Sequence, residues 1–254
     1  MDAMNIVYAS KSLGFVIPAL RVLLGLKPLT TTAYPLRVKA GLQFNKNARF
    51  RVKPGMTVLV IILLFATLLL PRLAYAKTIL VFGDSLSAAY GIPREAGWVS
   101  LLQQALQGSH PQYQVVNASI SGETAAGGRQ RIATALRQHK PGIVILALGA
   151  NDGLRGTPVA NIESNLSAII EQSRKAGAKI LLLGMQLPPN YGAQYTARFK
   201  ALYPKLAQRY DAALVSFFLQ GIAPEQFQAD NLHPTAAAQG KILHTVLEKL
   251  KPLL

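Results

Sequence analysis

The chain has 254 residues, no cysteine, four histidines and a formal net charge of +16. The lack of cysteine excludes disulfide bonds, thiolate zinc sites, a cysteine nucleophile and a lipidated N-terminal cysteine. The four histidines are far apart and include no pair spaced four residues apart on a helix, so we expect neither a metal site nor a cofactor.

The positive charge is unevenly distributed along the chain. Residues 1–55 contain nine Lys or Arg and one acid, whereas residues 77–254 contain seventeen basic and ten acidic residues. The basic residues of 77–254 are scattered and form no stripe interleaved with aromatic side chains. This pattern favours a solvated basic surface over a nucleic-acid site, and we expect no nucleic-acid partner.

Residues 56–76 are typical of a signal peptide. Thirteen apolar, uncharged residues at 58–70 are too few to span a membrane, which takes about 20 residues, but suit a signal-peptide core. Pro71 ends the run, and Ala74-Tyr75-Ala76 supplies the small residues that precede cleavage. We therefore expect cleavage after Ala76 and a periplasmic or secreted location.

Two features keep an uncleaved membrane anchor, facing the periplasm, open as an alternative. Arg72 follows the apolar run, and no basic residue directly follows Met56. Residues 1–55 are a long, basic prefix, which is unusual before a signal peptide. We favour Met56 as the true start, with 1–55 a misread or disordered segment, over a real basic tail that contains a weakly amphipathic stretch at 12–29.

Residues 77–254 have the length of one domain and alternate short apolar runs with amphipathic stretches. The runs predict strands at Thr78–Phe82, Tyr113–Asn117, Ile143–Leu148, Lys179–Gly184 and Ala213–Ser216. The stretches predict helices near Gly97–Gln107, Ala125–Lys140, Val159–Ala176, Ala193–Tyr210 and Thr235–Leu250. Strands such as Ile143–Leu148 are apolar on both faces, as parallel strands covered by helices are. We expect an α/β fold: a doubly wound, flavodoxin-like sheet of about five parallel strands with helices on both faces.

Polar motifs follow the predicted strands at the edge where such sheets bind ligands. Three of them come directly after strands, and a fourth precedes the last helix. They are Gly83-Asp84-Ser85, the segment 117–122, Gly149-Ala150-Asn151-Asp152, and Asp230-Asn231-Leu232-His233. Their convergence on one edge indicates a catalytic site more strongly than any single motif does.

Ser85, His233 and Asp230 are the residue types of a serine nucleophile, its base and an orienting acid. An imidazole titrates near neutral pH and can take the hydroxyl proton, while a carboxylate three residues earlier can hold the ring. Taken singly, Ser85 could be a helix cap, His233 a surface residue and Asp230 a solvated loop residue. Their joint placement at both ends of the domain favours catalysis.

Acyl transfer also requires hydrogen-bond donors for the negative oxygen of the tetrahedral intermediate. The candidates are the backbone N–H groups of Ser85 and Gly122 and the side-chain amide of Asn151. Taken singly, Gly122 could be a turn glycine and Asn151 a left-handed loop residue. With the triad accepted, the catalytic interpretation is favoured for both.

At these positions the chain resembles the SGNH (GDSL) hydrolase family, whose four blocks match the four motifs in order. The likeness covers nearly all of 77–254 and is greatest to the multifunctional thioesterase I/arylesterase/lysophospholipase L1 group. Further stretches that carry it are Asn117-Ala118-Ser119-Ile120-Ser121-Gly122-Glu123-Thr124, Asn151-Asp152-Gly153-Leu154-Arg155-Gly156 and Leu187-Pro188-Pro189-Asn190-Tyr191-Gly192. Ala150 replaces the second glycine of a Gly-Gly pair common in that group, a change that we expect to be harmless.

The resemblance implies a periplasmic serine hydrolase with broad activity on esters and thioesters. It assigns Ser85, Asp230 and His233 as the triad, and Ser85, Gly122 and Asn151 as the oxyanion hole. We expect a monomer whose partners are a small-molecule acyl ester or thioester and, at its surface, membrane lipids.

The substrate pocket is less clearly indicated by the sequence. Leu154, Leu187, Pro188 and Tyr191 follow the third and fourth predicted strands and could wall an apolar acyl pocket, although ordinary loop packing explains them equally well. The leading hypothesis is an exported serine esterase acting on acyl esters, thioesters and lysophospholipids. A carbohydrate-ester deacetylase and a non-catalytic lipid- or glycan-binding module stay open as alternatives.

Overall fold

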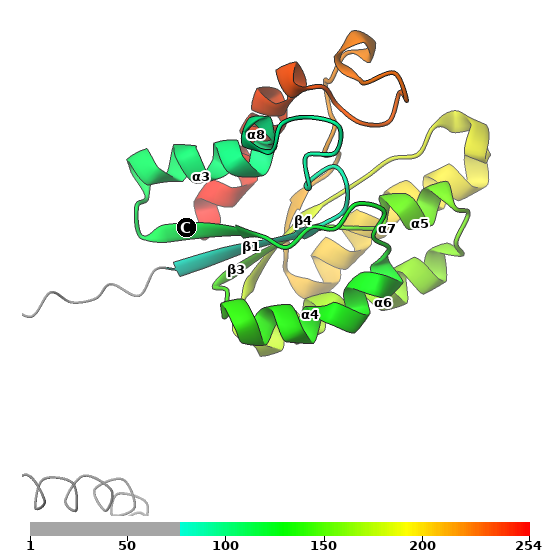
Figure 1. Cartoon of the computed structure of the whole chain (residues 1–254). Coiled ribbons are helices and arrows are strands. Elements are labelled where there is room, and N and C mark those ends of the chain that lie inside the picture. Colours follow the sequence, from blue (N-terminus) through cyan, green and yellow to red (C-terminus); the bar gives the residue numbers. More distant parts are fainter. Residues whose placement is uncertain (1–76) are drawn as a thin grey trace, which may run out of the picture. The chain divides into compact units, whose positions relative to one another are not determined.

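The computed structural model describes residues 77–254, so the expected prefix (1–55) and signal peptide (56–76) lie outside the described residues. Five strands form one parallel sheet in the order β2-β1-β3-β4-β5 (Figure 1). Their bounds are β1 Lys77–Gly83, β2 Tyr113–Asn117, β3 Ile143–Ala147, β4 Lys179–Leu183 and β5 Ala213–Val215. The expected α/β sheet is confirmed, and each predicted strand end lies within one residue of the observed one.

Helices connect these strands. The α-helices are α3 Trp98–Ser109, α4 Ala125–His139, α5 Ala150–Leu154, α6 Val159–Lys175, α7 Ala193–Tyr210 and α8 Gln239–Leu250. Short 3₁₀ turns occupy η1 Arg94–Ala96, η2 Pro189–Tyr191, η3 Pro224–Gln226, η4 Ala236–Ala238 and η5 Lys251–Leu253. The sequence pattern did not predict α5, and the helix expected from Thr235 begins as the separate turn η4.

The buried residues of the strands divide between two cores, because successive side chains point to opposite faces of the sheet. Ile79 and Val81 of β1 pack in the core that contains residues of α3 and α8, whereas Leu80 and Phe82 pack in the core that contains residues of α4, α6 and α7. Figure 1 shows the same arrangement, with α3 and α8 above the sheet and α4 and α6 below it. Burial on both faces explains why β3 is apolar throughout and why β1 and β4 are apolar after their first residues.

The strand order places a topological switch point between β1 and β3. From β1 the chain moves outward to β2 and then crosses to β3 on the other side of β1. Loops after strands that flank such a point separate and leave a crevice at the carboxyl edge of the sheet, where ligands of open α/β folds bind. The segments after Gly83 and after Ala147 lie at that edge.

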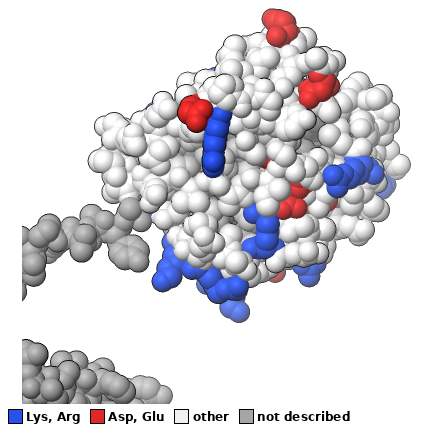
Figure 2. Space-filling view, in the orientation of Figure 1, with Lys and Arg blue, Asp and Glu red and all other residues white. Residues whose placement is uncertain are grey.

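The surface of the domain carries mixed charge. On the face drawn in Figure 2, basic and acidic side chains are scattered over a larger uncharged area. Within residues 77–254, no helix combines the length and the hydropathy needed to cross a membrane.

Candidate active site

Gly83 ends β1 in close contact with β3. A β-carbon at Gly83 would lie 2.9 Å from the Ser87 hydroxyl and 3.1 Å from both the β-carbon and the carbonyl oxygen of Ala147, so a side chain at this position would force these neighbours to shift. The chain then turns sharply, and the Asp84 carbonyl accepts hydrogen bonds from the N–H groups of Ser87 (3.1 Å) and Ala88 (3.0 Å). This turn places Ser85 directly beyond the end of a buried strand.

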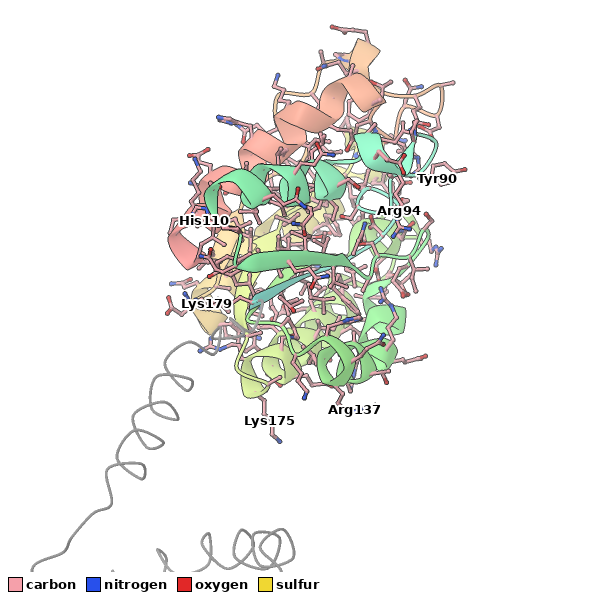
Figure 3. All side chains as sticks on the ribbon, turned by 60° about the vertical axis from the view of Figure 1, so that its left-hand side comes forward. Tyr90, Arg94, His110, Arg137, Lys175 and Lys179 are labelled. Atoms are coloured by element: carbon pink, nitrogen blue, oxygen red, sulfur yellow. The ribbon has the colours of Figure 1, made fainter. Side chains whose placement is uncertain are left out.

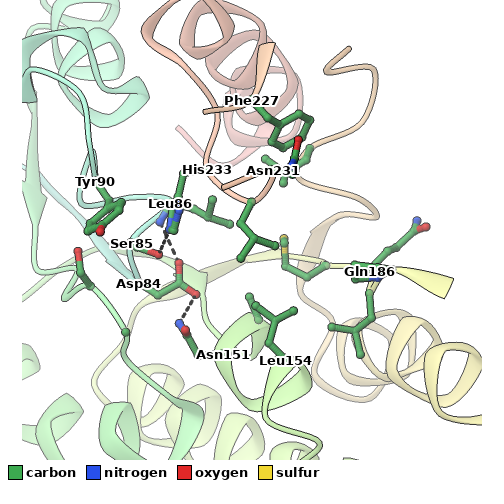
Figure 4. A pocket seen from close by; sticks show the side chains of 18 of the residues that line it. Asp84, Ser85, Leu86, Tyr90, Asn151, Leu154, Gln186, Phe227, Asn231 and His233 are labelled. Atoms are coloured by element: carbon green, nitrogen blue, oxygen red, sulfur yellow. Dashed lines mark hydrogen bonds between the residues drawn. The ribbon is translucent and has the colours of Figure 1, made fainter. Parts of the chain in front are cut away.

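Ser85, His233 and Asp230 form a continuous chain of hydrogen bonds. Figure 4 shows its first two members, Ser85 and His233. The Ser85 Oγ lies 2.8 Å from Nε2 of His233, and Nδ1 of the same ring lies 2.6 Å from Oδ2 of Asp230. The first distance is that of a normal hydrogen bond, and the second is short, as bonds to an ionised carboxylate tend to be. The structure therefore brings Ser85 into contact with His233, which lies 148 positions later in the sequence.

The Asp230 carboxylate determines which ring nitrogen of His233 carries the proton. Its Oδ1 accepts the N–H groups of Leu232 (2.9 Å) and His233 (3.0 Å). The His233 backbone N–H is the largest cause that lowers the pKa of Asp230 to about 2, followed by the His233 side chain and the Leu232 N–H. An ionised carboxylate only accepts hydrogen bonds, so a neutral His233 holds its proton on Nδ1 and accepts the Ser85 hydroxyl at Nε2. This is the arrangement that a general base needs.

Two backbone N–H groups at the site are free of partners. Neither the Ser85 N–H nor the Gly122 N–H has an acceptor among residues 77–254. Gly122 has a φ of +78°, and a β-carbon there would meet no atom within 4 Å, so backbone conformation rather than crowding favours glycine. Both residues line the same cavity, as the predicted oxyanion site requires.

Asn151 lies in α5, directly after β3, and its amide is engaged. Nδ2 donates to the carbonyl of Glu123 at 3.0 Å and, at a longer 3.4 Å, to Oδ2 of Asp84 (Figure 4). Asp84 itself is only 2 % exposed, and burial raises its pKa to about 7, against the opposing effect of the Leu86 N–H. The nearby negative charge of Asp152, whose own pKa is raised by burial, acts in the same direction.

A cavity of about 450 Å³ opens beside Ser85. Of the four residues predicted to wall it, Leu154, Leu187 and Pro188 do so. Tyr191 lies outside the lining and instead donates its hydroxyl to the Leu154 carbonyl at 3.1 Å. It therefore supports the cavity wall from behind.

Sequence reasoning missed several residues of the site. Apolar side chains from distant segments complete the cavity wall, and the motif residue Asp84 had been given no role of its own. The missed apolar residues are Leu86, Met185, Phe217, Leu219, Phe227 and Leu232. Three of these residues follow a strand or lie in the loop before the last helix: Met185, Phe217 and Phe227. Their local sequence pattern does not distinguish a residue that lines a cavity from one that packs in the core. The sequence did contain one indication that Asp84 is buried: this acidic residue directly follows an apolar strand that lies in the core.

Known proteins resemble this chain in sequence and structure. Residues 81–241 match the family described as GDSL-like Lipase/Acylhydrolase. "Esterase TesA" of Pseudomonas aeruginosa is 49 % identical over 191 residues, which cover 74 % of this chain and 95 % of that protein. "Thioesterase 1/protease 1/lysophospholipase L1" of Escherichia coli is 42 % identical over 193 residues, covering 75 % and 91 % respectively. A crystal structure of TesA, 48 % identical, superposes with a TM-score of 0.69 and covers 70 % of this chain and all of that one.

Proposed function

Because the chain belongs to the GDSL-like lipase/acylhydrolase family, we propose that it is an exported serine esterase that forms an acyl-enzyme on Ser85. The chain is an ester-hydrolysing enzyme, as its family and its esterase and thioesterase relatives establish. Acyl esters, thioesters and lysophospholipids are the substrate classes that we propose. The observation that carries the mechanism is the hydrogen-bonded chain from Ser85 through His233 to Asp230.

The reaction proceeds in two steps through Ser85. Its Oγ attacks the carbonyl carbon of the ester while Nε2 of His233 accepts the hydroxyl proton. The tetrahedral intermediate collapses, the alkoxide or thiolate leaves with the proton from His233, and the acyl group stays on Oγ. Water then attacks the acyl carbon while His233 accepts its proton. The second tetrahedral intermediate collapses, its bond to Oγ breaks, His233 returns the proton to Ser85 Oγ, and the carboxylic acid departs. Throughout, Asp230 holds the ring and stabilises its cation.

The oxyanion of each tetrahedral intermediate binds to the N–H groups of Ser85 and Gly122 and to the amide of Asn151. The free N–H groups support this assignment for the two backbone donors. For Asn151, the 3.4 Å hydrogen bond to Asp84 is the weaker of its two and can be exchanged for a bond to the oxyanion. The Glu123 carbonyl meanwhile holds the amide in place.

The cavity supports an acyl chain as the bound group. Its walls are mainly aliphatic and aromatic side chains, and each buried methylene contributes about 0.8 kcal/mol. A carbohydrate-ester deacetylase would be favoured by a groove of several exposed aromatic side chains that stack on sugars. Tyr90 is the single exposed aromatic residue of the cavity lining. Trp98, the single tryptophan, is fully buried and donates its indole N–H to the Leu86 carbonyl. All three triad residues are present, which disfavours a non-catalytic binding module.

Labelling of Ser85 and a substrate series test this function together. A fluorophosphonate should attach to Ser85 of purified 77–254, and mass spectrometry of the digested protein should find the adduct there. Ser87→Ala is the matched control, because Ser87 lies in the same turn and its hydroxyl is buried without a partner. With p-nitrophenyl esters, kcat/KM should rise with acyl length over the short-to-medium range. Labelling that persists in Ser85→Ala would refute the nucleophile, and a maximum at the acetyl ester would favour the deacetylase.

Export is a separate part of the proposal. We propose that 56–76 is a signal peptide cleaved after Ala76, that 1–55 is not part of the natural product, and that 77–254 is the mature, monomeric enzyme. Lys77 already belongs to β1, so cleavage at this point leaves the first described strand intact. N-terminal sequencing of the periplasmic fraction should find Lys77. Recovery of full-length protein only in membranes would instead support an anchor.

A further inference from the structure

The nucleophile and its base lie on separate loops that the sheet alone does not hold together. Ser85 follows β1, whereas His233 lies in the loop that precedes η4. The hydrogen bond between their side chains is 2.8 Å long, and small errors in the relative position of the two loops would break it. The contacts that join these loops therefore matter for the rate.

The His233 loop is folded as a narrow hairpin. The N–H of Thr235 donates to the Gln226 carbonyl at 2.7 Å, Phe227 pairs with Pro234, and the N–H of Gln228 donates to the His233 carbonyl at 2.7 Å. The hairpin, residues 226–235, thus fixes Gln228 directly opposite His233. Asp230 lies between them at its tip.

The side chain of Gln228 leaves this hairpin and reaches the Ser85 loop. Its Nε2 donates to the Tyr90 carbonyl at 2.9 Å and to the Pro234 carbonyl at 3.2 Å. Because both partners are acceptors, the amide nitrogen must point toward them and the oxygen away. The oxygen packs against Gly91, where a β-carbon would overlap it.

Tyr90 also contacts the turn that carries the nucleophile. Its N–H donates to the Ser85 carbonyl at 3.2 Å, which closes the turn that carries Ser85. Its ring is 52 % exposed and projects from the surface (Figure 3), with its centroid 4.5 Å from that of the His233 ring (Figure 4). A continuous path therefore runs from the Ser85 carbonyl through Tyr90 and Gln228 to the His233 carbonyl.

We propose that Gln228 is a positioning residue that sets the distance between Ser85 Oγ and His233 Nε2 by joining Tyr90 to the His233 hairpin. This inference rests on the proposed roles of Ser85 and His233. Gln228 lies outside the cavity lining and touches no reacting atom, so it acts only through the two loops that it joins.

A second glutamine also joins the His233 hairpin to a distant segment, the start of α3, but has a different role. Gln239 is 3 % exposed. Its side-chain oxygen accepts the backbone N–H of Trp98 at 3.1 Å, and its side-chain nitrogen donates to the Thr235 carbonyl at 3.3 Å. Loss of its side chain would leave buried polar groups unpaired and lower the stability of the domain. Gln228 is less buried, and its carbonyl partners can turn to water, so its loss should slow the reaction more than it destabilises the fold.

The test compares Gln228→Met and Gln228→Asn with the matched control Gln226→Met. Methionine keeps the length of the side chain without donors, and asparagine keeps the amide on a stem too short to reach Tyr90. The Gln226 side chain serves only the preceding turn, where its oxygen accepts the Ala223 N–H. The measurements are kcat and KM for a p-nitrophenyl ester, the rate of fluorophosphonate labelling of Ser85, the unfolding free energy in urea, and the NMR signal of the His233 Nδ1 proton.

Both Gln228 variants should lose about 10- to 100-fold in kcat and in labelling rate, with KM little changed and Gln226→Met close to the original enzyme. The Nδ1 proton signal should persist, because the contact between Asp230 and His233 is made within the hairpin. Labelling within twofold of the original in a folded variant would overturn the proposal, as would loss of the Nδ1 signal, which would mean that the hairpin itself had unfolded. If Gln228→Met fails to fold, Gln228→Asn decides. Ser85→Ala in the same assays tests the proposed function independently of Gln228. If Ser85→Ala is inactive, the proposed function stands whatever the Gln228 variants show. If it stays active, the proposed function is refuted.

Discussion

Ser85 and His233 lie in two regions that the fold holds by different means. The Ser85 region continues a strand whose last five residues are buried, and the next residue, Asp84, is 2 % exposed. The His233 region is a surface hairpin in which the side chain of Asp230 is 37 % exposed. The first region is positioned by the sheet and by buried polar contacts, the second by hydrogen bonds within a few residues of chain.

This difference predicts how each region responds to change. Buried polar groups in the Ser85 region are held in a poorly solvated environment, so a change of charge there affects the stability of the whole domain. In the hairpin, water solvates the carboxylate well, so changes there should affect mainly the rate. Both regions nevertheless meet in one reaction, and variants can test whether they act as a unit.

The largest expected effect is the loss of either reacting partner. Ser85→Ala removes the atom that carries the acyl group, and His233→Ala removes the base, so each should lower kcat by about 10⁴-fold or more. Asp230→Ala leaves both groups in place and should cost less. The double variant Ser85→Ala/His233→Ala should be no worse than either single one, as measured by ester hydrolysis. A further large loss in the double variant would show that the two regions act independently.

The next effect is a change in the unfolding free energy with pH, and it arises from Asp84 in the Ser85 region. The folded protein holds the Asp84 proton more tightly than the unfolded chain, because burial raises the pKa from 3.8 to about 7. Stability should therefore fall as the pH rises from about 4 to about 7, by up to about 4 kcal/mol at about 1.4 kcal/mol per pKa unit, and then level off. Asp84→Asn should make this slope clearly shallower in urea-unfolding free energies measured between pH 4.5 and 8. The slope that remains would come from Asp152, whose pKa is also raised by burial.

The control for this measurement is Asp211→Asn. Asp211 is an exposed residue in a left-handed conformation, which asparagine also adopts readily. The Asp211→Asn variant should show the same dependence of unfolding free energy on pH as the original protein. An unchanged slope in Asp84→Asn would show that Asp84 does not hold a proton in the folded state at these pH values.

A smaller effect should follow from removing the oxyanion donor at the edge of the Ser85 region. Asn151→Ala should lower kcat by about 10²- to 10³-fold with little change in KM, because the amide gains importance once negative charge develops. Steady-state kinetics on p-nitrophenyl esters measure this, with the exposed residue Asn161→Ala as control. If kcat/KM fell by the same factor through a higher KM with kcat unchanged, Asn151 would instead contribute to binding of the substrate ground state.

Local pattern in the sequence was sufficient for the strands, the long helices and the three triad candidates. Strands such as β3 are apolar throughout because both of their faces are covered, and helices such as α7 repeat their apolar residues with the helical period. Ser85 and Asp230 were recognisable because strand ends and short loops present polar side chains at the carboxyl edge of a parallel sheet. These features depend on residues close together in the chain, so the sequence alone carries them.

Tertiary structure alone decided the features that join distant segments. Helix α5 has five residues, too few for a helical period to appear. Gln228, Gln239 and Phe227 have no distinguishing local pattern, and their roles arise from the partners that the fold brings to them. The same holds for the placement of Tyr191 behind the cavity wall and for the burial of Asp84. Such contacts are determined by how strands and loops pack in three dimensions, which is information that no short window of the sequence contains.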